Sequence, residues 1–169
     1  MKVKPALLVI DIQNEFLRQV PEWDRGVALW MINAAIAMFR EYGFPVIRIY
    51  HTDPQWGPKP GTEPFEFPAS VAVLQEDPQI IKHHPSAFKK TELEKLLREL
   101  GCNAVFVTGL SAVQCALATY HAAKNLEFET FMVKDAIMSY KSTYTEYVEQ
   151  ISDTVGYAAL QLMLKVAAG

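Results

Sequence analysis

Two kinds of hydrophobic pattern alternate along this chain. Short stretches rich in apolar and β-branched residues predict strands buried in a sheet; they are residues 6–10, 44–50, 80–81, 104–108 and 128–133. Stretches in which apolar residues recur at a period near 3.6 predict helices; they are residues 26–42, 91–100, 113–124, 144–151 and 157–167. A further short strand is predicted near residues 154–156. Strands that alternate with helices indicate an α/β fold, a three-layer, doubly wound parallel sheet of about six strands.

Residue types at the ends of these stretches agree with that interpretation. Gly43 and Gly101 are typical of positions where a helix ends. Thr91, followed three residues later by Glu94, predicts a capping box at the start of the helix that follows. The last of the five main predicted strands is expected to end at residues 134–135, where the charged pair Lys-Asp interrupts the apolar run.

The remaining segments are predicted to be loops. Residues 12–16 and 21–23 resemble an exposed loop with a few apolar anchors. Residues 51–70, rich in proline, glycine and aromatic residues, form a long connection that is either a functional lid or interface element or a passive surface excursion. Several aromatic residues either wall an apolar pocket or fill a subunit interface; they are Trp23, Trp56, Phe65 and Phe67. No repeat or linker marks a second domain, so we expect residues 1–169 to form a single domain.

Composition and charge exclude several classes of function. Hydrophobic residues make up 50% of the chain and charged residues 21%, as in ordinary globular proteins. The net charge of −3 and the lack of a basic run give no reason to expect nucleic acid as a partner. No glycine-rich phosphate-binding motif follows the first strand, which argues against a nucleotide or dinucleotide enzyme.

Cysteine usage and apolar run lengths indicate a cellular location. Cys102 and Cys115 do not make a disulfide framework, and they fit a reducing compartment. The first apolar run, residues 6–10, stops at Asp11 and is too short for a signal peptide or a membrane span. We therefore expect a cytoplasmic protein with no membrane partner.

Three polar side chains follow predicted strands at the edge where doubly wound sheets bind ligands. Asp11 and Lys82 each follow a strand, and Cys115 lies in the first turn of the helix after the central strand, beyond a tight turn marked by Gly109 and Ser111. A carboxylate can remove a thiol proton, and a lysine can hold that carboxylate ionised while attracting a substrate carbonyl. Taken alone, Asp11 can also be a loop acid and Cys115 a small buried hydrophobe. Together the three residues predict a nucleophilic site.

The ionisation of Cys115 depends on opposing effects. The N-terminus of its helix and Lys82 favour the thiolate, whereas burial and the negative charge of Asp11 oppose it. Because catalysis needs attack by sulfur near neutral pH, we expect the first pair to dominate and the pKa of Cys115 to be low.

These residues lie in segments that resemble one enzyme family. The segments are Leu7-Leu-Val-Ile-Asp11-Ile-Gln13-Asn14-Glu-Phe16, Ile81-Lys82 with Ser86-Ala-Phe88, Leu96-Leu97-Arg-Glu-Leu100-Gly101, Val107-Thr-Gly109-Leu with Cys115 six residues after Gly109, and Val133-Lys-Asp135-Ala136. With them the chain resembles, over nearly its whole length, the isochorismatase-like hydrolases, also called the cysteine hydrolase superfamily, which includes nicotinamidases and N-carbamoylsarcosine amidohydrolases. The resemblance implies a small-molecule substrate and a homo-oligomer, a dimer or a tetramer.

The resemblance also implies catalytic roles. Asp11, Lys82 and Cys115 correspond to the family's triad, in which the cysteine forms a thioester or related adduct after ammonia or an amine leaves, and water then hydrolyses the adduct. The family has a cis peptide bond in the turn before the cysteine, which falls here between Leu110 and Ser111.

The same turn is expected to stabilise a developing negative charge. Backbone N–H groups near Ala112 and Cys115 would be aimed at the oxyanion. The chain departs from the family here, because Ala112-Val113 stands where the family often has Thr-Asp, and a polar contact near the nucleophile is missing.

No metal and no cofactor are expected. Metal-binding nicotinamidases carry an Asp-x-His after the second strand and a further histidine soon afterwards. This chain has His51-Thr-Asp53, and no histidine follows until His83, so three ligands at suitable spacing are not visible. His83 and His84 adjoin Lys82, and one of them could touch substrate, but both are interpreted as surface or loop-packing residues. His121 is interpreted as structural, and no role is assigned to Cys102.

Three functions fit these observations to different degrees. The first is a thiol hydrolase that cleaves a C–N bond in a small amide-like metabolite, with Cys115 as nucleophile, Asp11 as base and Lys82 as electrostatic partner. The second is an oligomer on the same fold that has lost catalysis and binds a small molecule or has a structural role. The missing polar groups at residues 112–113 are consistent with this second function. The third is a thiol redox protein, for which no resolving cysteine lies near Cys115. Retention of all three polar residue types favours the hydrolase.

Overall fold

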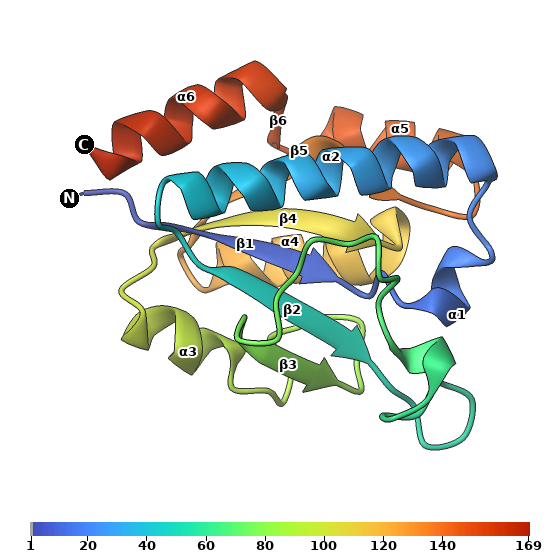
Figure 1. The fold of residues 1–169 in the computed structure, drawn as a ribbon. Coiled ribbons are helices and arrows are strands. Elements are labelled where there is room, and N and C mark those ends of the chain that lie inside the picture. The colour runs from blue at the N-terminus through green and yellow to red at the C-terminus, as the bar shows by residue number, and fades with distance from the viewer. Residues whose placement is uncertain (1) are drawn as a thin grey trace.

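A computed structural model describes residues 2–169 and contains one six-stranded sheet in which every strand pairing is parallel (Figure 1). The strands are β1 (Pro5–Ile10), β2 (Val46–His51), β3 (Gln79–Lys82), β4 (Ala104–Leu110), β5 (Glu129–Met138) and β6 (Thr154–Val155). Their order across the sheet is β3-β2-β1-β4-β5-β6. The chain therefore winds outward from β1 to one edge and then from β4 to the other, which confirms the predicted doubly wound fold.

Helices cover both faces of this sheet. They are α1 (Asn14–Leu17), α2 (Glu22–Glu41), the 3₁₀ turn η1 (Glu63–Phe65), α3 (Leu93–Glu99), the π-helical turn η2 (Ala112–Ala116), α4 (Leu117–Asn125), α5 (Ser142–Ile151) and α6 (Tyr157–Ala168). Figure 1 shows α2 and α6 on one face and α3 and α4 on the other. Within residues 2–169 no helix combines the length and the apolar character needed to cross a membrane.

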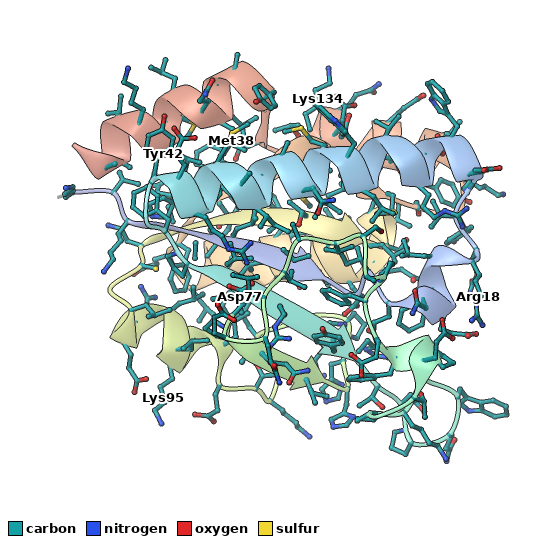
Figure 2. All side chains as sticks on the ribbon, viewed as in Figure 1. Arg18, Met38, Tyr42, Asp77, Lys95 and Lys134 are labelled. Atoms are coloured by element: carbon teal, nitrogen blue, oxygen red, sulfur yellow. The ribbon has the colours of Figure 1, made fainter. Side chains whose placement is uncertain are left out.

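The alternating side chains of the strands build one apolar core on each face. On the α2 side, Leu7 and Phe106 of the sheet pack with Phe39, and Figure 2 shows Met38 and Tyr42 where α2 meets α6. On the opposite side, buried residues of α3 and α4 pack against the sheet together with Val148 of α5. Because both faces of β1 and β4 are buried, their sequences are continuous apolar runs rather than alternating ones.

Helix α2 begins four residues earlier than predicted and runs through Gly26. The segment 21–23, expected to be loop, supplies its start, with Pro21 in the capping position just before the first turn. Glu22 and Asp24 lie in that first turn, where acidic side chains interact favourably with the free N–H groups. A short helix, α1, also forms where residues 12–16 suggested only loop.

Strand β5 does not end at Lys134-Asp135, so that prediction was wrong. The strand continues to Met138, and its pairing with β4 shifts between Val107 and Gly109. Asp135 takes a positive φ of 61° within the shifted segment. A bulge of this kind places extra residues on one strand without ending the pairing, so the two charged residues point out of an otherwise continuous ladder.

The capping box predicted at Thr91 does not form. Helix α3 begins at Leu93 with Glu92 in the capping position. The Thr91 hydroxyl donates to the Ala87 carbonyl and accepts, at 3.3 Å, the N–H of Leu93. Glu94 instead forms an ion pair with Arg98 across one helical turn, at 3.7 Å.

The long loop 51–70 is partly anchored in the core. Phe65 and Phe67 stack on Tyr50 with ring centroids 4.9 Å and 4.2 Å apart, and both are buried. These two rings therefore neither wall a pocket nor face a partner subunit. Trp56, by contrast, is 89% exposed.

Candidate active site

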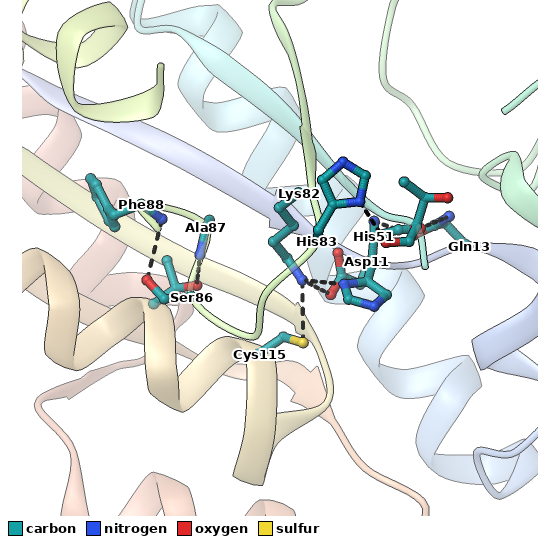
Figure 3. Close-up of polar contacts among 11 residues, drawn as sticks. Asp11, Gln13, His51, Lys82, His83, Ser86, Ala87, Phe88 and Cys115 are labelled. Atoms are coloured by element: carbon teal, nitrogen blue, oxygen red, sulfur yellow. Dashed lines mark hydrogen bonds and ion pairs between the residues drawn. The ribbon is translucent and has the colours of Figure 1, made fainter. Parts of the chain in front are cut away.

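The side chains of Asp11, Lys82 and Cys115 lie together at the carboxyl edge of the sheet (Figure 3). Lys82 Nζ is 2.7 Å from Asp11 Oδ2 and 3.3 Å from Cys115 Sγ. The parallel topology explains this convergence, because the carboxyl ends of β1, β3 and β4 all meet at one edge. Lys82 is fully buried and the Asp11 side chain is 3% exposed, so the ion pair is formed away from solvent.

His51 is a fourth member of this cluster that sequence reasoning missed. Its Nδ1 atom lies 3.2 Å from Lys82 Nζ. His51 is the last residue of β2 and stands in register with Lys82 on the neighbouring strand β3. In the sequence, His51 was considered only as part of an incomplete metal motif. Its position at the end of a predicted strand was the signal that could have placed it in the cluster.

Gln13 fixes the position of the His51 backbone. The fully buried Gln13 side chain donates from Nε2 to the His51 carbonyl at 3.0 Å and accepts the His51 N–H at 2.7 Å through Oε1. A side-chain amide that makes this pair of bonds imitates a neighbouring strand. The polar residue in the Asp11-Ile-Gln13 segment therefore ties the end of β1 to the end of β2.

Asp11 occupies an unusual backbone conformation. Its φ is +52°, in the left-handed region that aspartate tolerates better than most residues. The Asp11 N–H donates to the Ile49 carbonyl at 2.9 Å, which holds the turn against β2. Its Oδ1 atom is buried and has no hydrogen-bond partner within residues 2–169. One carboxylate oxygen is therefore bound by Lys82, and the other is a free acceptor.

The segment before Cys115 departs from the predicted helix start. Strand β4 extends through Gly109 to Leu110, and the peptide bond between Leu110 and Ser111 is cis, the position where the resemblance implies one. Cys115 then lies in the π-helical turn η2 rather than in the first turn of an α-helix. The Ser111 hydroxyl is hydrogen-bonded to that of Ser139 at 2.8 Å, and both are buried.

Glycine is required at position 109. Its φ is +107°, and a Cβ atom there would overlap the carbonyl of Ile10 on the adjacent strand. The close approach of β1 and β4 at this point brings the residues that follow them, Asp11 and the Cys115 turn, to the same side of the sheet.

Burial and neighbouring charges shift the pKa values of two groups in the cluster, Cys115 and Asp11. Burial, together with the neighbouring Asp11 carboxylate, raises the pKa of the Cys115 thiol to about 12, although Lys82 opposes the shift. The low pKa predicted for Cys115 was therefore wrong, because loss of solvent and a nearby anion outweigh the cation. Burial also raises the pKa of Asp11, against the lowering effect of Lys82.

His51 is neutral in this environment. Burial and then the Lys82 ammonium lower the pKa of His51 to about 4. Because the ammonium has only N–H donors, the contact with Lys82 requires an unprotonated Nδ1. The imidazole proton is therefore on Nε2.

A cavity of about 370 Å³ opens above the cluster, and a more open hollow of about 530 Å³ lies on the other side of Cys115. His51, Gln114 and Cys115 line both. The cavity is otherwise lined by Asp11, Phe16, Gln19, Val20, Leu110, Ser111 and Tyr140. His121, interpreted from the sequence as structural, lies on the rim of the second hollow.

The side chains near the cluster do not fit a metal site. Within residues 2–169 no group of three histidine, cysteine or acidic side chains is gathered as ligands. Asp53 Oδ1 accepts the backbone N–H groups of Gln55 and Trp56 at 2.8 Å and 3.0 Å, and His83 Nδ1 bonds the Thr52 carbonyl oxygen at 3.1 Å. That the reaction needs no metal stays a prediction.

Comparisons with known proteins show the family and the fold of this chain. The family model described as Isochorismatase domain matches residues 5–156. An uncharacterized isochorismatase family protein, YrdC of Bacillus subtilis, is 31% identical over 83% of this chain and 76% of its own length. N-carbamoylsarcosine amidase from Thermoplasma acidophilum has a TM-score of 0.78 at 25% identity, covering 91% of this chain and 95% of that one. Pyrazinamidase of Pyrococcus horikoshii, in complex with zinc, has a TM-score of 0.75 at 27% identity, covering 87% of this chain and 93% of that one.

Proposed function

This chain belongs to the isochorismatase family of hydrolases, and from that premise we propose that it cleaves the C–N bond of a small amide-like molecule with Cys115 as nucleophile. One observation carries the proposal: Lys82 Nζ contacts both Asp11 Oδ2 and Cys115 Sγ beneath a cavity that Asp11 and Cys115 line. A base, a cation and a thiol within such reach are the parts that nucleophilic catalysis requires.

The first half-reaction would transfer the acyl group to sulfur. As Cys115 Sγ attacks the carbonyl carbon, Asp11 accepts the thiol proton, and the C–S bond forms while the carbonyl π electrons move to oxygen. When the tetrahedral intermediate collapses, the C–N bond breaks and Asp11 returns the proton to the leaving nitrogen. Ammonia or an amine departs, and a thioester is left on Cys115.

The second half-reaction would hydrolyse the thioester. Asp11 takes a proton from water as the water oxygen attacks the thioester carbon, and the proton passes to sulfur when the C–S bond breaks. A carboxylic acid leaves and the thiol is restored. The unpartnered Asp11 Oδ1 is suited to both steps, because it is an acceptor not already bound by Lys82.

A thiol with a raised pKa fits this sequence of events. Cys115 need not be a thiolate in the resting enzyme if Asp11 removes its proton during attack. Lys82 then acts by opposing the effect of burial on Asp11, since its charge and hydrogen bond both lower the pKa of that carboxyl. We assign the stabilisation of the oxyanion to the turn formed by Leu110, Ser111 and Ala112, which joins β4 to the Cys115 turn.

The competing function is a binding protein on the same fold whose chemistry has decayed. The missing polar groups at Ala112 and Val113 favour it, whereas the intact Asp11–Lys82–Cys115 contacts favour catalysis. The names of two relatives, N-carbamoylsarcosine amidase and pyrazinamidase, support an amide as the substrate class here. No step of this proposal passes through a metal or an organic cofactor.

The test is a screen of small amides and carbamoyl compounds for ammonia release, followed by intact-protein mass spectrometry. We expect an acyl adduct on Cys115 that is absent in Cys115→Ser and much slower in Asp11→Asn. Cys102→Ser is the control, because Cys102 is buried away from the cluster and should not change the adduct. Adduct formation on Cys102 alone, or normal turnover by Cys115→Ser, would rule the mechanism out.

We also propose that the chain forms a homodimer through an exposed aromatic surface. This surface, the tryptophan face, comprises Trp23, Val27 and Trp30 of α2 and Tyr157 of α6. Trp23 is 80% and Trp30 66% exposed, and the Trp30 and Tyr157 rings stack at 6.2 Å. A contiguous apolar patch of this kind is unusual on a monomer and is typical of an interface.

A further inference from the structure

We infer that this site accepts uncharged amides and rejects substrates bearing a carboxylate, and that His51 binds the substrate through its Nε2–H; the inference rests on the proposed function. Among the described residues that line the cavity, Asp11 is the one formally charged side chain, and it is an anion. No lysine or arginine lines either the cavity or the second hollow in that part of the chain.

Lys82 is not available to bind a substrate anion. Its ammonium has three N–H donors, and three acceptors surround it: Asp11 Oδ2 at 2.7 Å, His51 Nδ1 at 3.2 Å and Cys115 Sγ at 3.3 Å. The side chain has no exposed surface. A carboxylate could reach it only by displacing one of these three groups, and two of them are the proposed base and nucleophile.

The nearest arginine in sequence is also engaged elsewhere. Arg18 precedes the rim residue Gln19, but its guanidinium bonds Glu15 at 3.3 Å and Glu63 at 2.9 Å. A substrate carboxylate placed in the cavity would therefore face Asp11 without a cation of its own. Burying a charge without a partner is strongly unfavourable, so such a substrate should bind poorly.

His51 supplies a neutral donor in place of a cation. Since Lys82 donates to Nδ1, the proton of the imidazole is held on Nε2. None of the hydrogen bonds within residues 2–169 uses this Nε2 atom, and His51 lines both hollows. The lowered pKa of His51 keeps the ring uncharged above about pH 4. The Nε2–H is thus a fixed donor for an acceptor atom of the substrate.

The rest of the cavity suits the same substrate class. Phe16, Val20 and Leu110 provide apolar surface, and the Phe16 ring packs against the His51 ring at 6.0 Å. Gln19 and Gln114 add amide groups that carry no charge. An amide attached to a flat or apolar group, with an acceptor for His51, matches this lining.

Matched substrates test the charge rule. Benzamide and 4-carbamoylbenzoate have the same reacting group and differ by one carboxylate. We expect kcat/KM for benzamide to exceed that for 4-carbamoylbenzoate at least 100-fold. Values within threefold of each other would overturn the inference.

A charge added at the rim provides the reverse test. Gln19→Arg should raise the ratio of kcat/KM for 4-carbamoylbenzoate to kcat/KM for benzamide at least tenfold, because Gln19 is exposed and lines the cavity. Gln19→Met, of similar size and no charge, is the matched control and should change this ratio by less than threefold. Equal effects of the two substitutions would count against the charge rule.

Two substitutions separate the contacts of His51. In His51→Asn the amide oxygen can still accept from Lys82, but the Nε2–H is lost, so we expect KM for benzamide to rise at least tenfold with a smaller change in kcat. In His51→Gln the longer side chain can keep a donor near the cavity but loses the acceptor for Lys82, so kcat should fall more than KM rises. An unchanged KM in His51→Asn would refute the binding role of His51.

Binding measurements distinguish this inference from the proposed chemistry. Isothermal titration of Cys115→Ala, which cannot form an adduct, should give tighter binding for benzamide than for 4-carbamoylbenzoate. Preferential binding of benzamide without turnover by the parent would refute the Cys115 mechanism and support the charge rule. Equal binding of the two compounds, or binding of neither, would refute the charge rule whatever the turnover.

Discussion

Lys82 Nζ and Asp11 Oδ2 form an ion pair at a distance of 2.7 Å, and both side chains are buried from solvent. Two opposite charges in a low-dielectric interior stabilise each other only while both are present, and removing one leaves the other without a partner. The pair therefore links the stability of the fold to the protonation of the proposed base.

Lys82→Met should leave the protein folded but less stable and nearly inactive. Loss of the ammonium removes the main effect that opposes burial, so the pKa of Asp11 should rise further and less of the carboxyl should be ionised and able to accept a proton. Breaking a buried pair costs about 3–5 kcal/mol. We expect a loss of that size in urea denaturation and at least a 100-fold fall in turnover. The double variant Asp11→Asn/Lys82→Met should recover stability but not activity; near-normal turnover of Lys82→Met would show that Lys82 has no catalytic part.

Alkylation of Cys115 should be slow at neutral pH. With a pKa of about 12, only a very small fraction of the thiol is ionised, and iodoacetamide reacts with the thiolate. In a Cys102→Ser background, the rate should still rise about tenfold per pH unit at pH 9. A plateau below pH 8 would mean that the thiolate already exists in the resting enzyme, as the sequence suggested.

The free energy of unfolding should depend on His51 at acidic pH. The pKa of His51 is about 4 in the folded chain and about 6.5 when the chain is unfolded, so between these values the unfolded state binds more protons. Stability is then lost as pH falls from about 6.5 to 4, by less than the maximum of about 1.4 kcal/mol per pH unit because His51 is half-buried. Denaturation curves at pH 4.5 and 7 should show a smaller loss in His51→Asn; identical losses in the two proteins would contradict the assignment.

Two glycine substitutions should have opposite effects. Gly109→Ala places a Cβ against the Ile10 carbonyl at a φ that alanine rarely adopts, so it should destabilise the protein and disturb the turn before Cys115. Gly26→Ala lies inside α2 with no atom near the new Cβ, and it should stabilise by about 0.5–1 kcal/mol. Thermal and urea denaturation measure both. Equal tolerance of the two changes would refute the close approach of β1 and β4.

Substitutions in the tryptophan face should weaken self-association. Trp30→Ser removes the stacking contact with Tyr157 and much of the exposed apolar surface, so it should raise the dimer dissociation constant at least tenfold. Trp56→Ser is the control, because Trp56 is even more exposed (89% against 66% for Trp30) but lies in the loop 51–70. Sedimentation velocity at micromolar concentration measures both. A single 19.1 kDa species of the parent would contradict the dimer.

The topology was predictable because each piece of it depends on local pattern. Apolar runs at residues 6–10 and 104–108 could only be strands covered on both faces, and parallel strands bring their carboxyl ends to one edge. The proximity of Asp11, Lys82 and Cys115 followed from that rule without any knowledge of distances.

Features that depend on distant contacts were not predictable in this way. Lys134-Asp135 looks like the end of a strand, but the bulge that carries the pair exists only because β4 holds the next residues in register. Thr91 has the sequence of a capping box, but its hydroxyl donates to the Ala87 carbonyl and accepts the Leu93 N–H, and Glu94 pairs with Arg98 instead of closing the box. The ionisation of Cys115 was misjudged because sequence reveals the nearby helix end but not the loss of solvent around the thiol.

His51 shows the same limit at the site. The position of His51 at the site is fixed by its register with Lys82 on an adjacent strand and by its hydrogen bonds with Gln13. Neither residue is near His51 in sequence. A motif search compares His51 with the residues that follow it, whereas its contacts come from Gln13, three residues after β1, and from Lys82 of β3.

Strand β3 lies at one edge of the sheet and pairs only with β2. Lys82 is its last residue, and the final rung of this ladder is the bond from the Thr52 N–H to the Lys82 carbonyl, at 3.0 Å. An edge strand can detach by breaking one ladder, while β1 and β4 are each held by two. Local opening of β3 would withdraw the ammonium from Asp11 while the rest of the sheet stays folded. Amide hydrogen exchange along β3 should therefore report how often the contacts among Asp11, Lys82 and Cys115 come apart without global unfolding.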